Sequence, residues 1–214
     1  MRVDVALLPA QRHSLEDSVC IVVDLLRASS TIVTLLGMGA REIVPAAGVK
    51  AARELRASLP GSLLSGETGG LPPPGFDYGN SPSEFQEVDL RGRSVILATS
   101  NGTRILNQVA AAPLVLVGAL LNCSAVAQAA AREAERLGLG VCIICCGAHG
   151  GSVFALEDAI GAGAIVAALA DRQADLPAAV LSDGAQAALA IYQRHAEDLA
   201  SAIASSSHAG DLVE

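Results

Sequence analysis

The chain has 214 residues, 51% of them hydrophobic, which is enough apolar material for the core of one domain spanning 1–214. Its formal net charge is −8 at pH 7, whereas nucleic-acid binding normally needs a basic surface. With two Tyr, three Phe and no Trp, the chain also has few aromatic side chains on which bases could stack. We therefore expect no nucleic-acid partner.

Short apolar segments alternate with Ala-rich segments along the chain, an order typical of an α/β protein with a largely parallel sheet. The longest stretch without periodicity, 66–82, contains three consecutive prolines, and so long a loop usually has a function. We expect one domain that is divided into two lobes. The predicted strands are 3–8, 19–25, 42–46, 62–65, 94–98, 114–118, 141–145 and 178–181, and the predicted helices are 30–38, 49–58, 102–111, 124–137, 156–170 and 184–204.

The segment 105–131 has no charged residue and is long enough to cross a bilayer as one helix. Polar residues and Pro113 interrupt it, so helix, strand and helix describe it better. The N-terminus has Asp4 where a secretory signal would be apolar. These features predict a cytoplasmic protein that does not enter the membrane.

The first candidate functional residues follow the apolar run 19–23. Asp24 stands where a carboxylate either holds a hard cation or caps the next helix. Arg27 could bind a phosphate or sulfonate with two hydrogen bonds, or could form a salt bridge with Asp24.

Two polar clusters, 75–82 and 99–103, lie among apolar segments. Backbone N–H groups of Gly-containing loops, with hydroxyl and amide side chains, are suited to holding a phosphate-like anion. Asn101 and Thr103 could instead cap the helix that begins near Gly102, and we predict that one structure serves both purposes. The candidate anion ligands in these clusters are Asn80, Ser81, Thr99, Ser100, Asn101, Gly102 and Thr103.

A Gly-rich turn at 147–151 precedes the acidic pair Glu157-Asp158. Its glycines, Gly147, Gly150 and Gly151, would allow the backbone to approach a ligand closely. His149 is either a general acid or an ordinary loop histidine, and the helix dipole alone would favour the acidic pair. Ligands of parallel sheets bind beyond the carboxyl ends of strands, so Asp24, Glu67, Thr99 and Gly147 can converge there in a metal-assisted phosphate site.

Several common motifs are absent from the sequence. It has no G-x-x-x-x-G-K-[ST] loop, no complete dinucleotide fingerprint, no Cys-x5-Arg phosphatase loop and no Asp-x-Asp nucleophile. Four of its five cysteines lie in or beside Val- and Ile-rich runs, which predicts a structural role for them.

Four ordered segments resemble the 2-phosphosulfolactate phosphatase family, the ComB-like magnesium-dependent acid phosphatases of coenzyme M biosynthesis. They are VVDLLRASSTI at 22–32, GE at 66–67 with GFDYGNSP at 75–82, TSNGT at 99–103, and CCGAHGGSVFALED at 145–158. The resemblance implies a three-layer α/β/α fold, Mg²⁺ dependence, and hydrolysis of a phosphate monoester on a three-carbon acid that carries carboxylate and sulfonate. The segment 205–214 is similar to a late family segment after which relatives continue, so the domain is expected to be shortened there.

On this basis Asp24 is the first candidate metal ligand, followed by Glu67 and Asp158. Arg27 and the 99–103 loop would hold the phosphate, the 147–152 loop would lie near the acidic end of the substrate, and His149 completes the catalytic candidates. Either water or Asp24 could attack the phosphorus. A phosphatase of another small hydroxy acid and a non-catalytic anion sensor remain alternatives, and a homodimer is compatible with the sequence.

Overall fold

The computed structural model describes residues 1–12, 15–171 and 179–212. Among these residues, five parallel strands form the larger of two sheets, in the order β6-β2-β7-β1-β8. These strands are β1 (Arg2–Ala6), β2 (Ser18–Val23), β6 (Leu114–Gly118), β7 (Gly140–Cys145) and β8 (Val180–Leu181).

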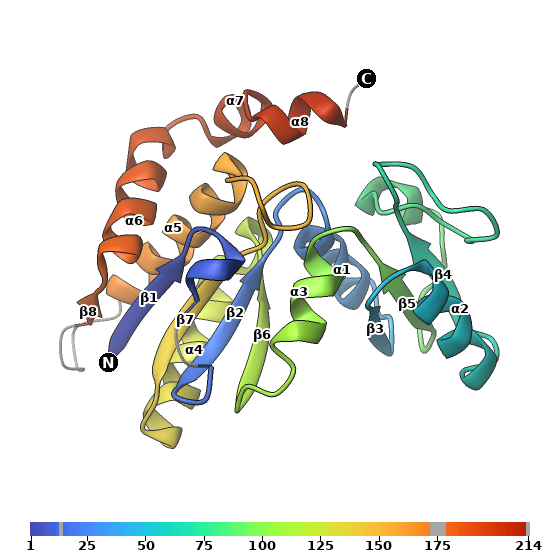
Figure 1. Ribbon diagram of the computed structural model, residues 1–214, viewed down its shortest axis with the longest axis horizontal. Coiled ribbons are helices and arrows are strands. Elements are labelled where there is room, and N and C mark those ends of the chain that lie inside the picture. Colours follow the sequence, from blue (N-terminus) through green and yellow to red (C-terminus); the bar gives the residue numbers. More distant parts are fainter. Residues whose placement is uncertain (13–14, 172–178, 213–214) are drawn as a thin grey trace.

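A second, three-stranded sheet lies beside the first and has the order β3-β5-β4, again parallel. It consists of β3 (Glu42–Ala46), β4 (Leu63–Gly66) and β5 (Ser94–Ala98). The two sheets give the molecule the two lobes seen in Figure 1, where the smaller sheet is on the right. The sequence indicated a single largely parallel sheet, and the second sheet is a finding of the structure.

Helices cover both faces of the sheets, which confirms the three-layer α/β/α fold. Helices α4, α5 and α6 pack on one face of the larger sheet and α3 on the other, while α1 and α2 pack against the smaller sheet (Figure 1). The helices are α1 (Ala28–Gly37), α2 (Val49–Ser58), α3 (Gly102–Gln108), α4 (Cys123–Leu137), α5 (Leu156–Ala170), α6 (Asp183–His195), α7 (Leu199–Ala204) and α8 (Ser207–Asp211), with short 3₁₀ turns at Pro9–Gln11, Pro82–Phe85 and Leu120–Asn122.

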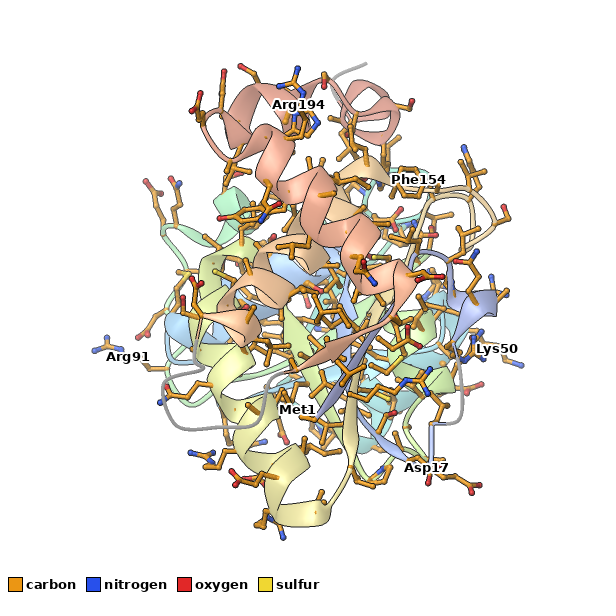
Figure 2. All side chains as sticks on the ribbon, turned by 90° about the vertical axis from the view of Figure 1, so that its left-hand side faces the viewer. Met1, Asp17, Lys50, Arg91, Phe154 and Arg194 are labelled. Carbon is orange, nitrogen blue, oxygen red and sulfur yellow. The ribbon has the colours of Figure 1, made fainter. Side chains whose placement is uncertain are left out.

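Strand β2 shows why the sequence is apolar at successive positions. Val19, Ile21 and Val23 pack with the cluster under α4, α5 and α6, whereas Cys20 and Val22 belong to the cluster under α3. Both faces of a strand are buried when helices cover both faces of its sheet. Charged side chains such as Asp17, Lys50 and Arg91 project instead from the periphery (Figure 2).

The segment 105–131 contains the end of α3, strand β6 and the start of α4, as predicted. Within the described part of the chain, no helix is long and apolar enough to span a bilayer. The predicted helix 184–204 is wrong in its continuity, because Asp198 caps a new helix, α7, by accepting a hydrogen bond from the Ser201 N–H. The predicted strand 178–181 is observed at Val180–Leu181, and Ala178 lies outside the described residues.

Candidate active site

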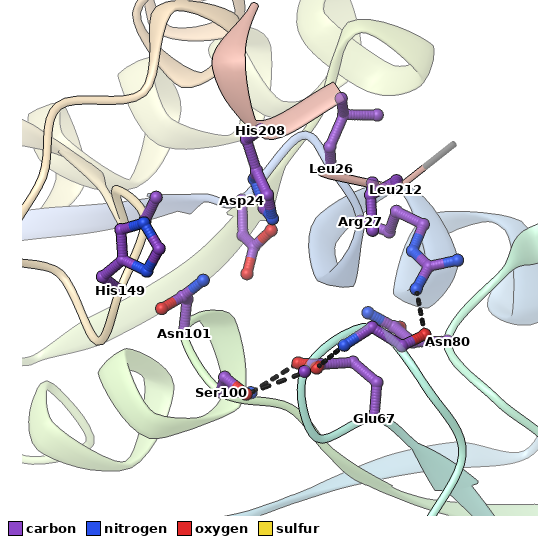
Figure 3. Close-up of a pocket in the computed structure, with 13 residues that line it drawn as sticks. Asp24, Leu26, Arg27, Glu67, Asn80, Ser100, Asn101, His149, His208 and Leu212 are labelled. Atoms are coloured by element: carbon purple, nitrogen blue, oxygen red, sulfur yellow. Dashed lines mark hydrogen bonds between the residues drawn. The ribbon is translucent and has the colours of Figure 1, made fainter. Parts of the chain in front are cut away.

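A pocket of about 320 Å³ lies where the carboxyl ends of β2 and β7 meet those of β4 and β5 from the other sheet (Figure 3). Its volume is suited to a small ligand. Seven predicted site residues line it: Asp24, Arg27, Glu67, Asn80, Ser100, Asn101 and His149. Of the four strand-end residues expected to converge, Asp24 and Glu67 line the pocket, whereas Thr99 and Gly147 do not.

Asp24 follows β2 and is only 5% exposed. Its Oδ1 accepts a hydrogen bond from the Ala28 N–H at 3.3 Å, at the start of α1. Burial raises the pKa of Asp24 to about 6, although the Ala28 hydrogen bond and the nearby His208 act in the opposite direction. A buried carboxylate with so raised a pKa is typical of a functional group.

Arg27 reaches from the start of α1 toward the second lobe. Its Nη2 donates to the carbonyl oxygen of Gly70 at 3.2 Å, and among the described residues no ion pair joins it to Asp24. The remaining N–H groups of the guanidinium are thus available to an anion in the pocket.

Glu67 follows β4 and is hydrogen-bonded to the loop that follows β5. Its Oε1 accepts from the Ser100 N–H at 2.7 Å, and its Oε2 accepts from the Gly70 N–H at 3.0 Å. The Ser100 hydroxyl donates to Oε2 as well, at 3.3 Å. A carboxylate has about four lone-pair positions, so these three bonds leave about one, on Oε1, for a ligand.

The start of α3 differs from the sequence-based expectation. Asn101 occupies the N-cap position, but its side chain does not cap the helix and instead accepts a hydrogen bond from the Gly150 N–H at 2.8 Å. The side chain that caps is that of Thr99, whose Oγ1 accepts from the Thr103 N–H at 3.1 Å. Thr99, Gly102 and Thr103 are buried and do not line the pocket. Their part is to fix the turn that presents Ser100 and Asn101.

The Gly-rich turn after β7 supports the pocket mainly through its shape. His149 lines the pocket with a φ of 49° in the left-handed region, while Gly147, Gly150 and Gly151, also at positive φ, do not line it. The bond from Gly150 to Asn101 holds this turn against α3.

Asp158 lies behind the pocket rather than in its lining. Its Oδ1 accepts from the Leu25 N–H at 2.8 Å and its Oδ2 from the Gly147 N–H at 2.9 Å. It therefore joins the loop after β2 to the loop after β7. Burial, together with the charge of Asp24, raises the pKa of Asp158.

Asn80 and Ser81 have different places at the end of the 66–82 loop. Asn80 lines the pocket and is 3% exposed, and its Oδ1 is buried without a hydrogen-bond partner among the described residues. Ser81 is not in the lining and takes the N-cap position of the 3₁₀ turn Pro82–Phe85, where its N–H donates to Glu84 Oε1 at 3.2 Å. A buried amide oxygen without a partner, in a residue that shares the pocket lining with two carboxylates, is the kind of feature that a bound ligand would explain.

A metal ion usually needs several protein ligands that are already close together. Within residues 1–12, 15–171 and 179–212, no group of three or more His, Cys, Asp and Glu side chains is close enough to hold a metal ion. The carboxylates in the lining are Asp24 and Glu67.

The lining also contains residues that sequence reasoning did not assign. His208 is the polar side chain among them, and it lies beside Asp24 in Figure 3. His208 lies in the segment 205–214 that resembles a late family segment, but its partner, Glu157, is 51 residues away, so their pairing has no local signal. The lining residues not named individually as candidates are Leu26, Gly69, Gly70, Ala148, His208 and Leu212, of which Ala148 belongs to the 147–152 loop that was expected near the substrate.

The cysteines near the site are expected to be dispensable for chemistry. Cys145 and Cys146 are fully buried, and burial raises the pKa of each thiol well above its usual range, so neither forms the thiolate that a nucleophile needs. Replacing either by Ala should lower stability by about 1 kcal/mol through lost packing, while the folded fraction keeps its turnover. Melting curves with kinetics check this, and a folded variant without turnover would contradict it.

Comparison with known proteins shows the family of the chain. A family model described as 2-phosphosulpholactate phosphatase matches residues 6–214. A probable 2-phosphosulfolactate phosphatase of Carboxydothermus hydrogenoformans is 39% identical over 173 residues, covering 81% of this chain and 69% of the relative. Proteins described in the same words from Deinococcus radiodurans and Pseudothermotoga lettingae are 39% and 38% identical, and cover 100% and 99% of this chain and 84% and 85% of their own lengths. The chain belongs to the 2-phosphosulpholactate phosphatase family.

Proposed function

We propose that the protein hydrolyses 2-phosphosulfolactate to sulfolactate and phosphate, in a Mg²⁺-dependent reaction of the coenzyme M biosynthesis type. Its relatives are described as probable phosphatases of this substrate. The observation that carries the proposal is the pocket itself, in which a buried carboxylate, Asp24, and a guanidinium, Arg27, face the same small space.

Magnesium suits the oxygen donors of this pocket. Mg²⁺ is usually bound by one or two carboxylates together with water and substrate phosphates, and Asp24, Glu67 and the orphaned Oδ1 of Asn80 are donors of this kind. These residues would hold the ion because they line the pocket, whereas Asp158 lies outside the lining. Bound there, Mg²⁺ would neutralise negative charge on the phosphate.

Side chains of the pocket would bind the phosphate ester and help to break its P–O bond. Arg27 binds phosphate oxygens with the N–H groups that Gly70 leaves free, and Ser100 and Asn101 orient the ester from the end of β5. His149 lies at the rim, where it can protonate the leaving oxygen. The P–O bond breaks either by direct attack of water or by attack of Asp24, followed by water. Rapid acid quenching during turnover separates the two, since only the second route leaves phosphate on the protein.

Two alternatives make different predictions. A phosphatase of another small hydroxy acid would use the same pocket, and a non-catalytic sensor would bind the anion without turnover. Phosphate release should be measured with 2-phosphosulfolactate, 2-phospholactate and 2-phosphoglycerate, with Mg²⁺ or with EDTA. We expect the sulfonated ester to have the highest kcat/KM and EDTA to lower the rate at least about a hundredfold. Equal rates in EDTA would contradict the role of the metal, and no release from any ester would favour the sensor.

The proposal extends to the setting of the enzyme. The partner is a small anionic ester rather than nucleic acid, in keeping with the net charge of −8. We also propose a cytoplasmic location and a homodimer. Light scattering on the purified protein tests the second of these.

A further inference from the structure

The C-terminal helix α8 forms one wall of the pocket. It begins after Ser206, whose Oγ accepts the Ala209 N–H at 3.2 Å, and His208 and Leu212 from this segment belong to the pocket lining. Figure 1 shows α7 and α8 crossing the top of the molecule after α6. The last described residues thus add a polar side chain to a site otherwise built from strand ends.

His208 is held by a buried carboxylate. Its Nδ1 lies 3.0 Å from Oε1 of Glu157, in the first turn of α5. The Glu157 side chain is 1% exposed, and that of His208 is 20% exposed. An ionised carboxylate only accepts, so Nδ1 carries the hydrogen of this bond, and the orientation of the ring is fixed.

The helix dipole explains why an acidic residue is favoured at position 157, but it does not explain why the Glu157 side chain is buried. An acidic side chain in the first turn of a helix gains from the dipole while it remains in water, whereas burial of a carboxylate is costly unless it is paired. The pairing partner of Glu157 is an imidazole in the wall of the pocket. The buried Glu157 carboxylate is therefore placed where it holds the His208 ring in the pocket lining.

We propose that His208 contacts an oxygen of the bound phosphate ester through Nε2, and that Glu157 is the positioning residue that fixes its ring through Nδ1. No hydrogen bond from the described residues engages Nε2, and the ring shares the pocket with Asp24 (Figure 3). A carboxylate behind an imidazole is a common way of keeping one ring nitrogen directed at a substrate. This assignment rests on the proposed function, because it uses the same pocket and the same ester.

Two substitutions of His208 separate its two contacts. In His208→Asn the amide nitrogen takes about the place of Nδ1, so the bond to Glu157 is kept and the contact to the ester is lost. In His208→Gln the amide nitrogen takes about the place of Nε2, so the contact to the ester is kept and the bond to Glu157 is lost.

We expect His208→Asn to melt like the wild type, with kcat/KM lowered about a hundredfold. This is the size of effect seen when a transition-state hydrogen-bond donor is removed. We expect His208→Gln to retain more activity than His208→Asn. His195→Asn, at the end of α6 and outside the lining, is the matched control.

The role of Glu157 is tested by a double-mutant cycle. Glu157→Gln should lower kcat/KM about tenfold in the wild type and hardly at all in the His208→Asn background, because it acts through the ring. Additive losses would overturn the positioning role.

Binding of inorganic phosphate in the presence of Mg²⁺, measured by calorimetry, gives a readout without turnover. The His208→Asn variant should bind phosphate at least about tenfold more weakly than the wild type, while His195→Asn binds it equally well. If the wild type hydrolyses no ester, the proposed function fails, yet the phosphate affinities still decide the role of His208. A folded His208→Asn variant with wild-type phosphate affinity would overturn the inference.

Discussion

Replacing Asp24 with Asn is expected to lower kcat/KM at least about a thousandfold without unfolding the protein. Asp24 is buried at the pocket end of β2, and as metal ligand or as nucleophile it needs a negative charge that Asn lacks. Single-turnover assays with circular dichroism measure the two effects separately. Asp89→Asn is the control, because Asp89 is exposed and pairs with Arg91 away from the pocket.

The same substitution should stabilise the metal-free protein. Burial raises the pKa of Asp24 to about 6, above the value near 3.9 of an unfolded chain. The folded state therefore binds this proton more tightly than the unfolded state does. As the pH rises from about 4 to about 6, Asp24 ionises and the free energy of unfolding falls progressively. In EDTA at pH 7 to 8, Asp24→Asn should melt at a higher temperature than the wild type, and the difference should shrink below about pH 4.

Two results would count against this account of Asp24. A variant that keeps more than about a tenth of the wild-type rate has lost less than about 1.4 kcal/mol of transition-state stabilisation, too little for a ligand or nucleophile. A variant that melts lower than the wild type in EDTA at pH 7 would show that the ionised carboxylate is well accommodated in the fold.

Local pattern was sufficient to predict most elements of the fold. The bounds of β3, β5, β6, α2 and α5 agree with those expected from the sequence, because apolar periodicity and turn residues are local signals. Asp24 and Glu67 could likewise be placed at strand ends, and the rule that parallel strands share a binding edge brought them together.

Long-range pairing could not be predicted in this way. Nothing local in β3, β4 or β5 shows that they pair with one another rather than with β1 and β2, so the second sheet was missed. The link between Glu157 and His208 was missed for the same reason, since it depends on where α8 lies against α5. The type and position of Asn101 fit a helix cap, whereas its side chain accepts a hydrogen bond from Gly150, in a loop that is distant in the sequence.

Gly102→Ala is expected to damage both activity and stability, although the backbone at this position would accept alanine. A Cβ atom on residue 102 would lie 2.5 Å from Oδ2 of Asp24 and 2.6 Å from Cβ of Ala28. Contacts this short force a shift. The Asp24 carboxylate could rotate away, but the Ala28 Cβ is fixed by the backbone of α1, so the starts of α1 and α3 would also have to move apart, and with them Asp24. We expect kcat/KM to fall at least about a hundredfold and stability to fall by about 1–3 kcal/mol.

Gly37→Ala separates this steric effect from a general response to removing a glycine. Gly37 ends α1, and a Cβ there would meet nothing within 4 Å, so this variant should be as stable as the wild type or slightly more so, because alanine is the better helix former. Urea unfolding and initial rates on both variants test the expectation. The contradicting outcome would be a Gly102→Ala variant with the same rate and stability as Gly37→Ala. Asp24 could then move without loss of activity, so its fixed position beside α3 would not be required.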